Sequence, residues 1–66
     1  MYVTKIQKKT LEIYDAETGA LKRVINCAIF DGIVKADTEG NLVSIVCGDK
    51  RIRVYDINTG FLKTTI

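Results

Sequence analysis

The chain has 66 residues, enough for one small domain and too few for two. With 47% hydrophobic residues, 27% charged residues and no proline, its composition is that of a globular protein, and no apolar run approaches the roughly 18 residues of a membrane helix. The net charge of +2 is too small to indicate nucleic-acid binding by itself, and the lack of histidine excludes catalytic triads and metal sites that depend on it.

Short segments between turn signals predict β-strands along the whole chain, with clear period-two alternation in residues 11–14 and 52–55. In order, they are residues 2–6, 11–14, 21–25, 33–36, 42–47, 52–55 and 61–66. Turn-forming residues separate them, most clearly at residues 15–19, 37–41 and 56–60. In two of these turns we expect an Asp carboxylate to accept backbone N–H bonds and a Gly to take positive φ. The structural turn residues are therefore Asp15, Thr18, Gly19, Asp56, Thr59 and Gly60.

The chain contains an internal repeat, because residues 9–25 align without gaps to residues 50–66 at an offset of 41 positions. Eight of the seventeen aligned positions are identical. Leu11 corresponds to Ile52 and Ile13 to Val54, so the apolar phase of the strand is kept. A repeat of this length is typical of arrays of similar supersecondary units.

The second copy resembles the WD-repeat and YVTN-type β-propeller families, whose blades are four-stranded antiparallel meanders. Residues 48–63 (GDKRIRVYDINTGFLK) carry the resemblance: a turn, a strand that ends in an aromatic–Asp pair, and a Thr-Gly turn into the last strand. Tyr stands where WD repeats have Trp, and the Gly-His pair is absent. The resemblance implies that residues 26–66 form a full blade, with strands a to d, and residues 1–25 a partial blade, with strands b to d.

We therefore predict a single all-β domain over residues 1–66, a β-propeller fragment of two antiparallel blades with three and four strands. Both faces of a blade are packed, which suits a strand with Val43, Ile45 and Cys47 on one face and Leu42, Ser44 and Val46 on the other. Since two repeats alone leave apolar faces open, we expect homo-oligomerisation to complete a closed ring. Propellers hold about four to eight blades, so we expect three chains, with two or four as alternatives.

Cys27 and Cys47 lie twenty residues apart, without the close pairing of a zinc ribbon or the density of a disulfide scaffold. We expect both thiols to be reduced and buried, with no metal and no cofactor. Residues 1–9 are short, alternating and basic, unlike a signal peptide, so we expect a cytoplasmic protein without a membrane partner.

Charged residues gather in different turns, and an antiparallel meander places those turns at opposite ends of the strands. The candidate binding residues are basic and share one end: Lys8, Lys9, Lys50 and Arg51, accompanied by Asp31 and Asp49. The opposite turns hold the carboxylates of Asp15, Glu17, Asp37, Glu39 and Asp56. The sequence thus predicts a ring with one basic and one acidic face.

No motif indicates catalysis, and the carboxylates fall in turns where short polar residues favour the local conformation. We expect a non-enzymatic binding or scaffold protein whose partners are other copies of itself and a further protein. The alternative is nucleic-acid or polyanion binding on the basic face, with Tyr2, Tyr14 or Tyr55 as stacking groups. A catalytic site in the central channel is the third hypothesis.

Overall fold

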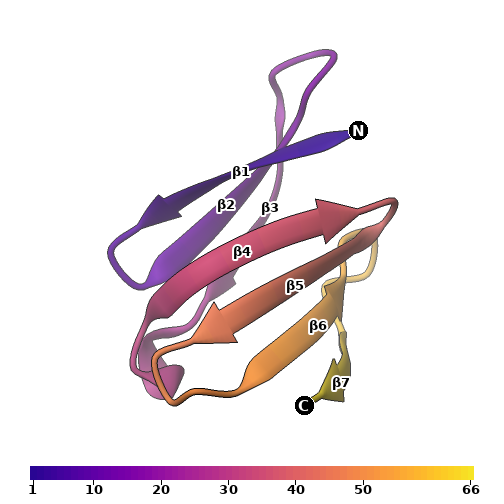
Figure 1. The fold of residues 1–66 in the computed structure, drawn as a ribbon. Coiled ribbons are helices and arrows are strands. Elements are labelled where there is room, and N and C mark those ends of the chain that lie inside the picture. The colour runs from indigo at the N-terminus through magenta and orange to yellow at the C-terminus, as the bar shows by residue number, and fades with distance from the viewer.

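The structure, a computed structural model that describes residues 1–66, consists of two antiparallel sheets (Figure 1). Sheet A is formed by β1 (Tyr2–Gln7), β2 (Thr10–Asp15) and β3 (Leu21–Asn26). Sheet B is formed by β4 (Ile33–Glu39), β5 (Leu42–Cys47), β6 (Ile52–Asp56) and β7 (Leu62–Thr65). The predicted all-β chain with one three-stranded and one four-stranded sheet is confirmed, and the sequence missed only η1 (Ala28–Phe30), a short 3-10 helix.

One predicted turn is shorter than expected. Strand β4 continues through Glu39, which pairs with Leu42, so the turn consists of Gly40 and Asn41 alone. Gly40 has a φ of +58°, a conformation that glycine adopts without steric cost. Asp37 therefore lies inside the strand, opposite Ser44, and its prediction as a turn residue was wrong.

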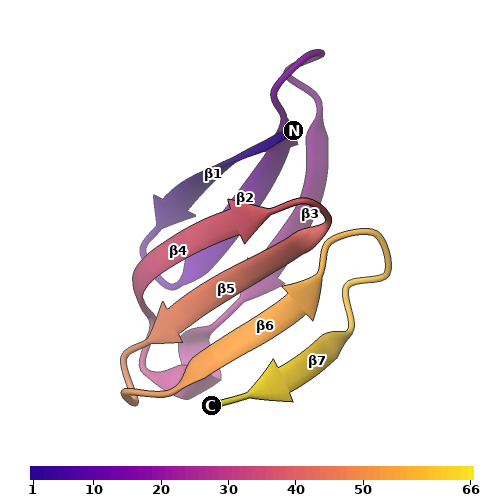
Figure 2. The ribbon, with the colours of Figure 1, turned by 45° about the vertical axis from the view of Figure 1, so that its right-hand side comes forward.

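The two sheets pack face to face, with sheet B in front of sheet A in Figure 2. Their inner faces enclose the buried apolar side chains Leu11, Ile13, Ile25, Cys27, Val43, Ile45, Cys47 and Ile57. In β5 the expected alternation is confirmed, because Val43, Ile45 and Cys47 are buried while Leu42 and Ser44 are exposed. Hydrophobic burial between the sheets supplies the core of the fold.

The two copies of the repeat share strand register. Leu11 in β2 lies opposite Ile6 in β1, just as Ile52 in β6 lies opposite Val46 in β5. Both copies also carry the same bulge, between Ile13 and Tyr14 in β2 and between Val54 and Tyr55 in β6. Strand β1 therefore corresponds to β5, and β4 has no counterpart in sheet A.

The faces of sheets A and B that correspond in the repeat point in the same direction, so that one faces the core and the other faces away from it. Leu11 and Ile13 are fully buried against sheet B. Their counterparts Ile52 and Val54 lie opposite Val46 and Ser44, on the face of sheet B that points away from sheet A. The sheets are thus stacked head to tail, whereas a twofold-related sandwich would bring the same face of each sheet to the core.

Candidate functional site

The candidate site is the end of the molecule that carries Lys8, Lys9, Lys50 and Arg51, here named the basic end. It combines the β1–β2 turn, the β5–β6 turn and the segment from Cys27 to Gly32, which lie together at the lower left of Figure 1. The N–H of Cys27 donates to the carbonyl of Lys9 at 2.8 Å, and the N–H of Gly48 donates to that of Gly32 at 3.0 Å. These bonds join two turns far apart in sequence into one surface.

Two lysines of the basic end have an unusual backbone. Lys8 has a φ of +55° and Lys50 a φ of +70°, in the left-handed region that side chains with a Cβ disfavour. Both residues are exposed, so packing does not require lysine at either position. The chain thus accepts local backbone strain at two hairpins, and each strained residue presents a positive charge.

Asp49 is neutralised inside the chain by a residue that sequence analysis did not single out. Arg53 donates two hydrogen bonds to its carboxylate, of 3.1 and 2.8 Å, in the only ion pair of the structure. The bond to Arg53 holds the pKa of Asp49 below its ordinary value. Lys8, Lys9, Lys50 and Arg51 have no such partner, so their charges face solvent.

The remaining predicted turn residues lie at the other end, at the upper right of Figure 1. Asp15 accepts from the N–H of Glu17 at 2.8 Å and of Thr18 at 3.3 Å, and these bonds lower the pKa of its carboxyl. Asp56 forms the equivalent bonds to Asn58 and Thr59, of 2.8 and 3.2 Å.

The threonine and glycine of each turn repeat the same geometry. Thr18 Oγ1 accepts the N–H of Ala20, and Thr59 Oγ1 accepts that of Phe61, both at 3.2 Å. Gly19 and Gly60 have φ values of +76° and +78°. These six residues therefore act through local backbone geometry.

The end that carries Asp15, Glu17, Glu39 and Asp56 is here named the acidic end. It also contains a basic residue, Arg23, that sequence analysis did not place there. Arg23 donates to the carbonyl of Ile57 at 2.6 Å and to that of Asn58 at 2.8 Å, so its guanidinium from sheet A covers the β6–β7 turn of sheet B. A Cβ on Gly60 would lie 2.6 Å from the tip of the flexible Arg23 side chain, which would have to shift, so the main requirement for glycine here is its φ of +78°.

The two cysteines are buried and free, Cys27 in the segment before η1 and Cys47 at the end of β5. Burial, together with the neighbouring Cys47, raises the pKa of the Cys27 thiol to about 11. No group of three or more Asp, Glu or Cys side chains gathers as a metal-binding cluster, and no helix has the length and hydropathy needed to span a bilayer.

Comparison with protein-family models, with curated proteins and with solved structures finds no match.

Proposed function

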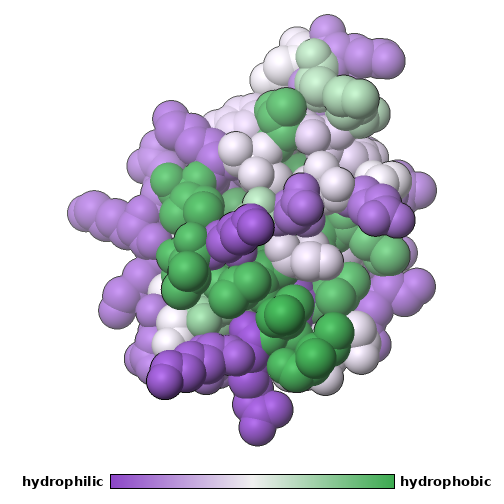
Figure 3. All heavy atoms as spheres, viewed as in Figure 1, coloured by the Kyte–Doolittle hydropathy of each residue, from purple (hydrophilic) through white to green (hydrophobic).

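We propose that this chain is a non-enzymatic scaffold protein, which forms a closed propeller-type ring of identical chains and binds an acidic surface of another protein through its basic end. The observation that carries the ring is the head-to-tail order of the two sheets. Sheet B covers the face of sheet A that bears Leu11 and Ile13. The corresponding face of sheet B, with the half-buried Ile52 and Val54, is covered by no other sheet, and it is here named the open face. Hydrophobic side chains gather on this face in Figure 3.

The proposed occupant of the open face is the outer face of sheet A from a second copy. That face presents Val3 and Val24, which are 50% and 49% exposed in the single chain. A contact between unlike faces leaves a further open face on each new copy, so it extends until the chain of copies closes into a ring.

Polar residues on the two outer faces can pair across this contact. On sheet A, Lys5 lies opposite Glu12. On sheet B, Lys35 and Asp37 lie on the outer side of β4, opposite Val46 and Ser44. A base and a carboxylate on each face allow complementary pairing, which fixes the register of two surfaces. Three chains would place six blades in the ring, within the range of about four to eight that propellers use; two or four chains remain alternatives.

Two features of the basic end support a role in binding. Its four basic side chains are exposed and outside any ion pair, so they are free to attract an anionic surface. In addition, lysine occupies two left-handed positions at which glycine would be less strained. A ring repeats this patch once per chain, so a multivalent partner would engage several copies.

The positions of the tyrosines favour a protein partner over a nucleic acid. Tyr14 and Tyr55 precede the acidic-end turns, and Tyr2 lies opposite Asp15 at the same end. The tyrosines therefore lie far from the basic side chains, and the one aromatic ring of the basic end, Phe30, is already covered by the Arg53 guanidinium. Proteins that bind single strands instead interleave free aromatic and basic groups. Nucleic-acid or polyanion binding remains the second hypothesis.

Solution mass tests the ring. Native mass spectrometry and light scattering should give a multiple of the 7.4 kDa chain, with three copies expected. A folded single chain at micromolar concentration would contradict the ring.

Charge reversal tests the basic end. Lys8→Glu with Lys50→Glu should leave the mass of the assembly unchanged and weaken capture of an acidic protein partner, mainly through a slower association rate that depends on salt. Lys22→Glu with Lys63→Glu is the matched control, because these two lysines are also exposed, lie one in each copy of the repeat and change the net charge equally. Equal losses for both pairs would contradict the assignment. Tighter, salt-dependent binding to DNA or RNA would favour the second hypothesis instead.

A further inference from the structure

The β1 edge of sheet A has no partner strand, although the corresponding edge of β5 in sheet B has one. Strand β5 pairs with β4 on one side and β6 on the other, whereas its counterpart β1 pairs with β2 alone. In sheet B, β4 lies beside Ser44 and Val46. The register of the repeat makes Thr4 and Ile6 the counterparts of these two residues, and no strand pairs with them.

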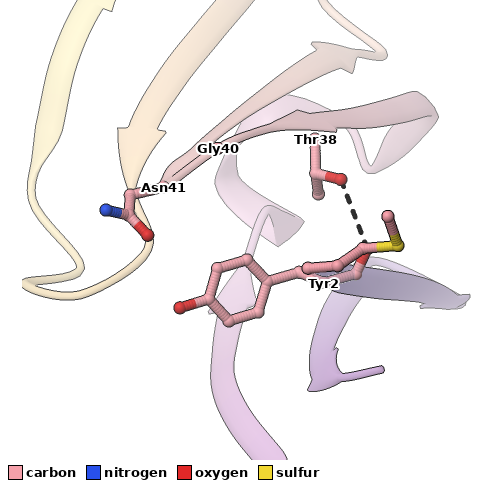
Figure 4. Close-up of a pocket in the computed structure, with 5 residues that line it drawn as sticks. Tyr2, Thr38, Gly40 and Asn41 are labelled. Carbon is pink, nitrogen blue, oxygen red and sulfur yellow. Dashed lines mark hydrogen bonds between the residues drawn. The ribbon is translucent and has the colours of Figure 1, made fainter. Parts of the chain in front are cut away.

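The backbone groups at this edge can be identified from the direction of two hydrogen bonds. The carbonyl of Met1 accepts the N–H of Ala16 at 3.0 Å and so points toward β2. Since backbone groups alternate in direction along a strand, those of Tyr2, Thr4 and Ile6 point to the opposite, unpaired edge. The Thr38 hydroxyl donates to the carbonyl of Tyr2 at 3.3 Å from that side, which agrees with this direction (Figure 4).

Although β4 of sheet B passes close to β1, both ends of the unpaired edge are open to solvent. At its start, Met1, Tyr2, Thr38, Gly40 and Asn41 line an open pocket, and in Figure 4 the Tyr2 ring extends toward the Gly40–Asn41 turn. At its other end, the Ile6 side chain is 43% exposed although it belongs to the inner face of the sheet. Unpaired strand edges of this kind are templates for pairing with another chain.

Charge at the two ends of β1 sets a direction for the incoming chain. Strand β1 runs from the acidic end, where Tyr2 lies near the turn that follows Glu39, to the basic end at Lys8 and Lys9. The structure already uses antiparallel pairing at the corresponding edge of β5. An antiparallel segment on β1 would begin near the lysines and finish near the carboxylates.

We propose that the free edge of β1 binds an extended segment of a partner protein, which adds to sheet A as an antiparallel fourth strand. Apolar side chains at alternate positions of the segment pack beside Ile6. The segment has acidic residues at its N-terminal end and basic residues at its C-terminal end. Main-chain hydrogen bonds to Thr4 and Ile6 hold the segment, and its charged ends give its orientation. This site goes beyond the proposed ring and does not depend on ring closure.

Amide exchange and an NMR titration test the site directly. In the free protein, the N–H groups of Val3 and Lys5 should exchange slowly and those of Thr4 and Ile6 quickly. The probe is the peptide acetyl-EEVTVTVKK-amide, and the control is acetyl-KKVTVTVEE-amide, which has the same composition with exchanged ends. The first peptide should slow exchange at Thr4 and Ile6 and bind about tenfold more tightly than the second. Binding without protection of these two amides, or equal affinity of both peptides, would overturn the proposal.

A proline variant removes one bond at the edge. Thr4→Pro deletes an N–H that faces away from β2, so the fold should survive, as proline does on edge strands. Its affinity for the first peptide should fall about tenfold, the effect of one lost hydrogen bond. Thr4→Val is the matched control, because it also removes the hydroxyl but keeps the N–H; the loss of affinity in Thr4→Pro beyond that in Thr4→Val measures the lost bond. If Thr4→Pro does not fold, the probe peptide methylated at alternate amide nitrogens supplies the same test: methylation at one parity should abolish binding and at the other preserve it. Equal effects at both parities would also overturn the proposal.

The site and the ring can fail separately. In the variant Ile52→Asp, which is designed to break the ring contact, the peptide should still protect Thr4 and Ile6. Loss of peptide binding in this variant, with the fold intact, would show that the edge exists only within an assembly and would overturn its independence from the ring. A ring that forms without binding peptide would overturn the edge site alone.

Discussion

The guanidinium of Arg53 in β6 donates two hydrogen bonds, of 3.1 and 2.8 Å, to the carboxylate of Asp49 in the β5–β6 turn. The same guanidinium lies 3.6 Å from the centre of the Phe30 ring, which belongs to η1. The N–H of Asp49 donates in turn to the carbonyl of Phe30 at 3.1 Å. These contacts fix the β5–β6 turn against the segment between the sheets, and thereby the positions of Lys50 and Arg51.

Removal of the Arg53 charge should release the carboxyl of Asp49. In Arg53→Met the pKa of Asp49 should return toward its ordinary value of 3.8, because the hydrogen bond from Arg53 is the main cause of its depression. A lowered folded-state pKa stabilises the fold above the ordinary pKa, and this contribution is lost as pH falls toward the folded-state value. The acid-induced loss of stability below pH 5 should therefore be smaller in the variant. A carboxyl-carbon NMR titration measures the pKa, and an unchanged value would contradict the role of Arg53.

The strands and turns could be predicted from the sequence because both depend on local chemistry. Period-two alternation in the two copies of the repeat and apolar segments between turn signals located all seven strands. The Asp15 and Asp56 turns follow from side chains that bond to the backbone two and three residues ahead. The resemblance to four-stranded propeller blades, applied to both copies of the repeat, also predicted the division into three and four strands. None of these features requires knowledge of which sheet faces meet.

The features that the sequence did not predict depend on packing between the sheets. Arg53 alternates with the apolar Ile52 and Val54, a pattern in which the polar residue is expected to face solvent. It is only 8% exposed, because the face of β6 that carries Arg53 is the one that meets sheet A. Arg23 likewise finds its acceptors 34 and 35 residues away. Strand alternation gives two faces to each sheet but does not say which face is covered.

Glycine at the two left-handed lysine positions should stabilise the fold. The left-handed conformation costs a residue with a Cβ roughly 1–2 kcal/mol of stability. Glycine avoids this strain but loses about 0.5–1 kcal/mol through the larger chain entropy of its unfolded state. Lys8→Gly and Lys50→Gly should therefore each raise the free energy of unfolding by about 0.5–1 kcal/mol while weakening binding at the basic end. Urea denaturation measures the first effect. Lys9 has no positive φ, so the control Lys9→Gly should lower the free energy of unfolding. A change of the same sign in Lys8→Gly and Lys9→Gly would contradict backbone strain at Lys8.

Leu11→Ala and Ile52→Ala should affect different properties, although the two residues are repeat counterparts. Leu11 is fully buried between the sheets, so its truncation should cost about 2–5 kcal/mol of unfolding free energy. Ile52 lies on the open face of sheet B, so its truncation should weaken assembly while the two-sheet unit stays folded. Circular dichroism at low concentration and native mass spectrometry separate the two effects.

The aspartate variants sharpen this contrast. Leu11→Asp places an unpaired charge in the core and should unfold the chain. Ile52→Asp should give a folded single chain. If instead Ile52→Asp unfolds the chain at low concentration and Leu11→Asp is tolerated, the assignment of inner and outer faces is wrong.

The Cys27 thiol should be protected from reagents and should stabilise the fold only in its protonated form. Its pKa of about 11, against 9.0 for an ordinary thiol, lowers the thiolate fraction in the folded chain near pH 8 by about 100-fold. Native labelling with a maleimide should therefore be at least that much slower than labelling in urea. Because the folded-state pKa is raised, the stabilising contribution is complete below pH 9 and declines as pH rises from 9 toward 11. The urea midpoint of the parent protein should fall across this window more steeply than that of Cys27→Ala, in which only the other groups titrate. Parallel pH profiles, or rapid native labelling of Cys27, would show that this thiol is not held in a buried, protonated state.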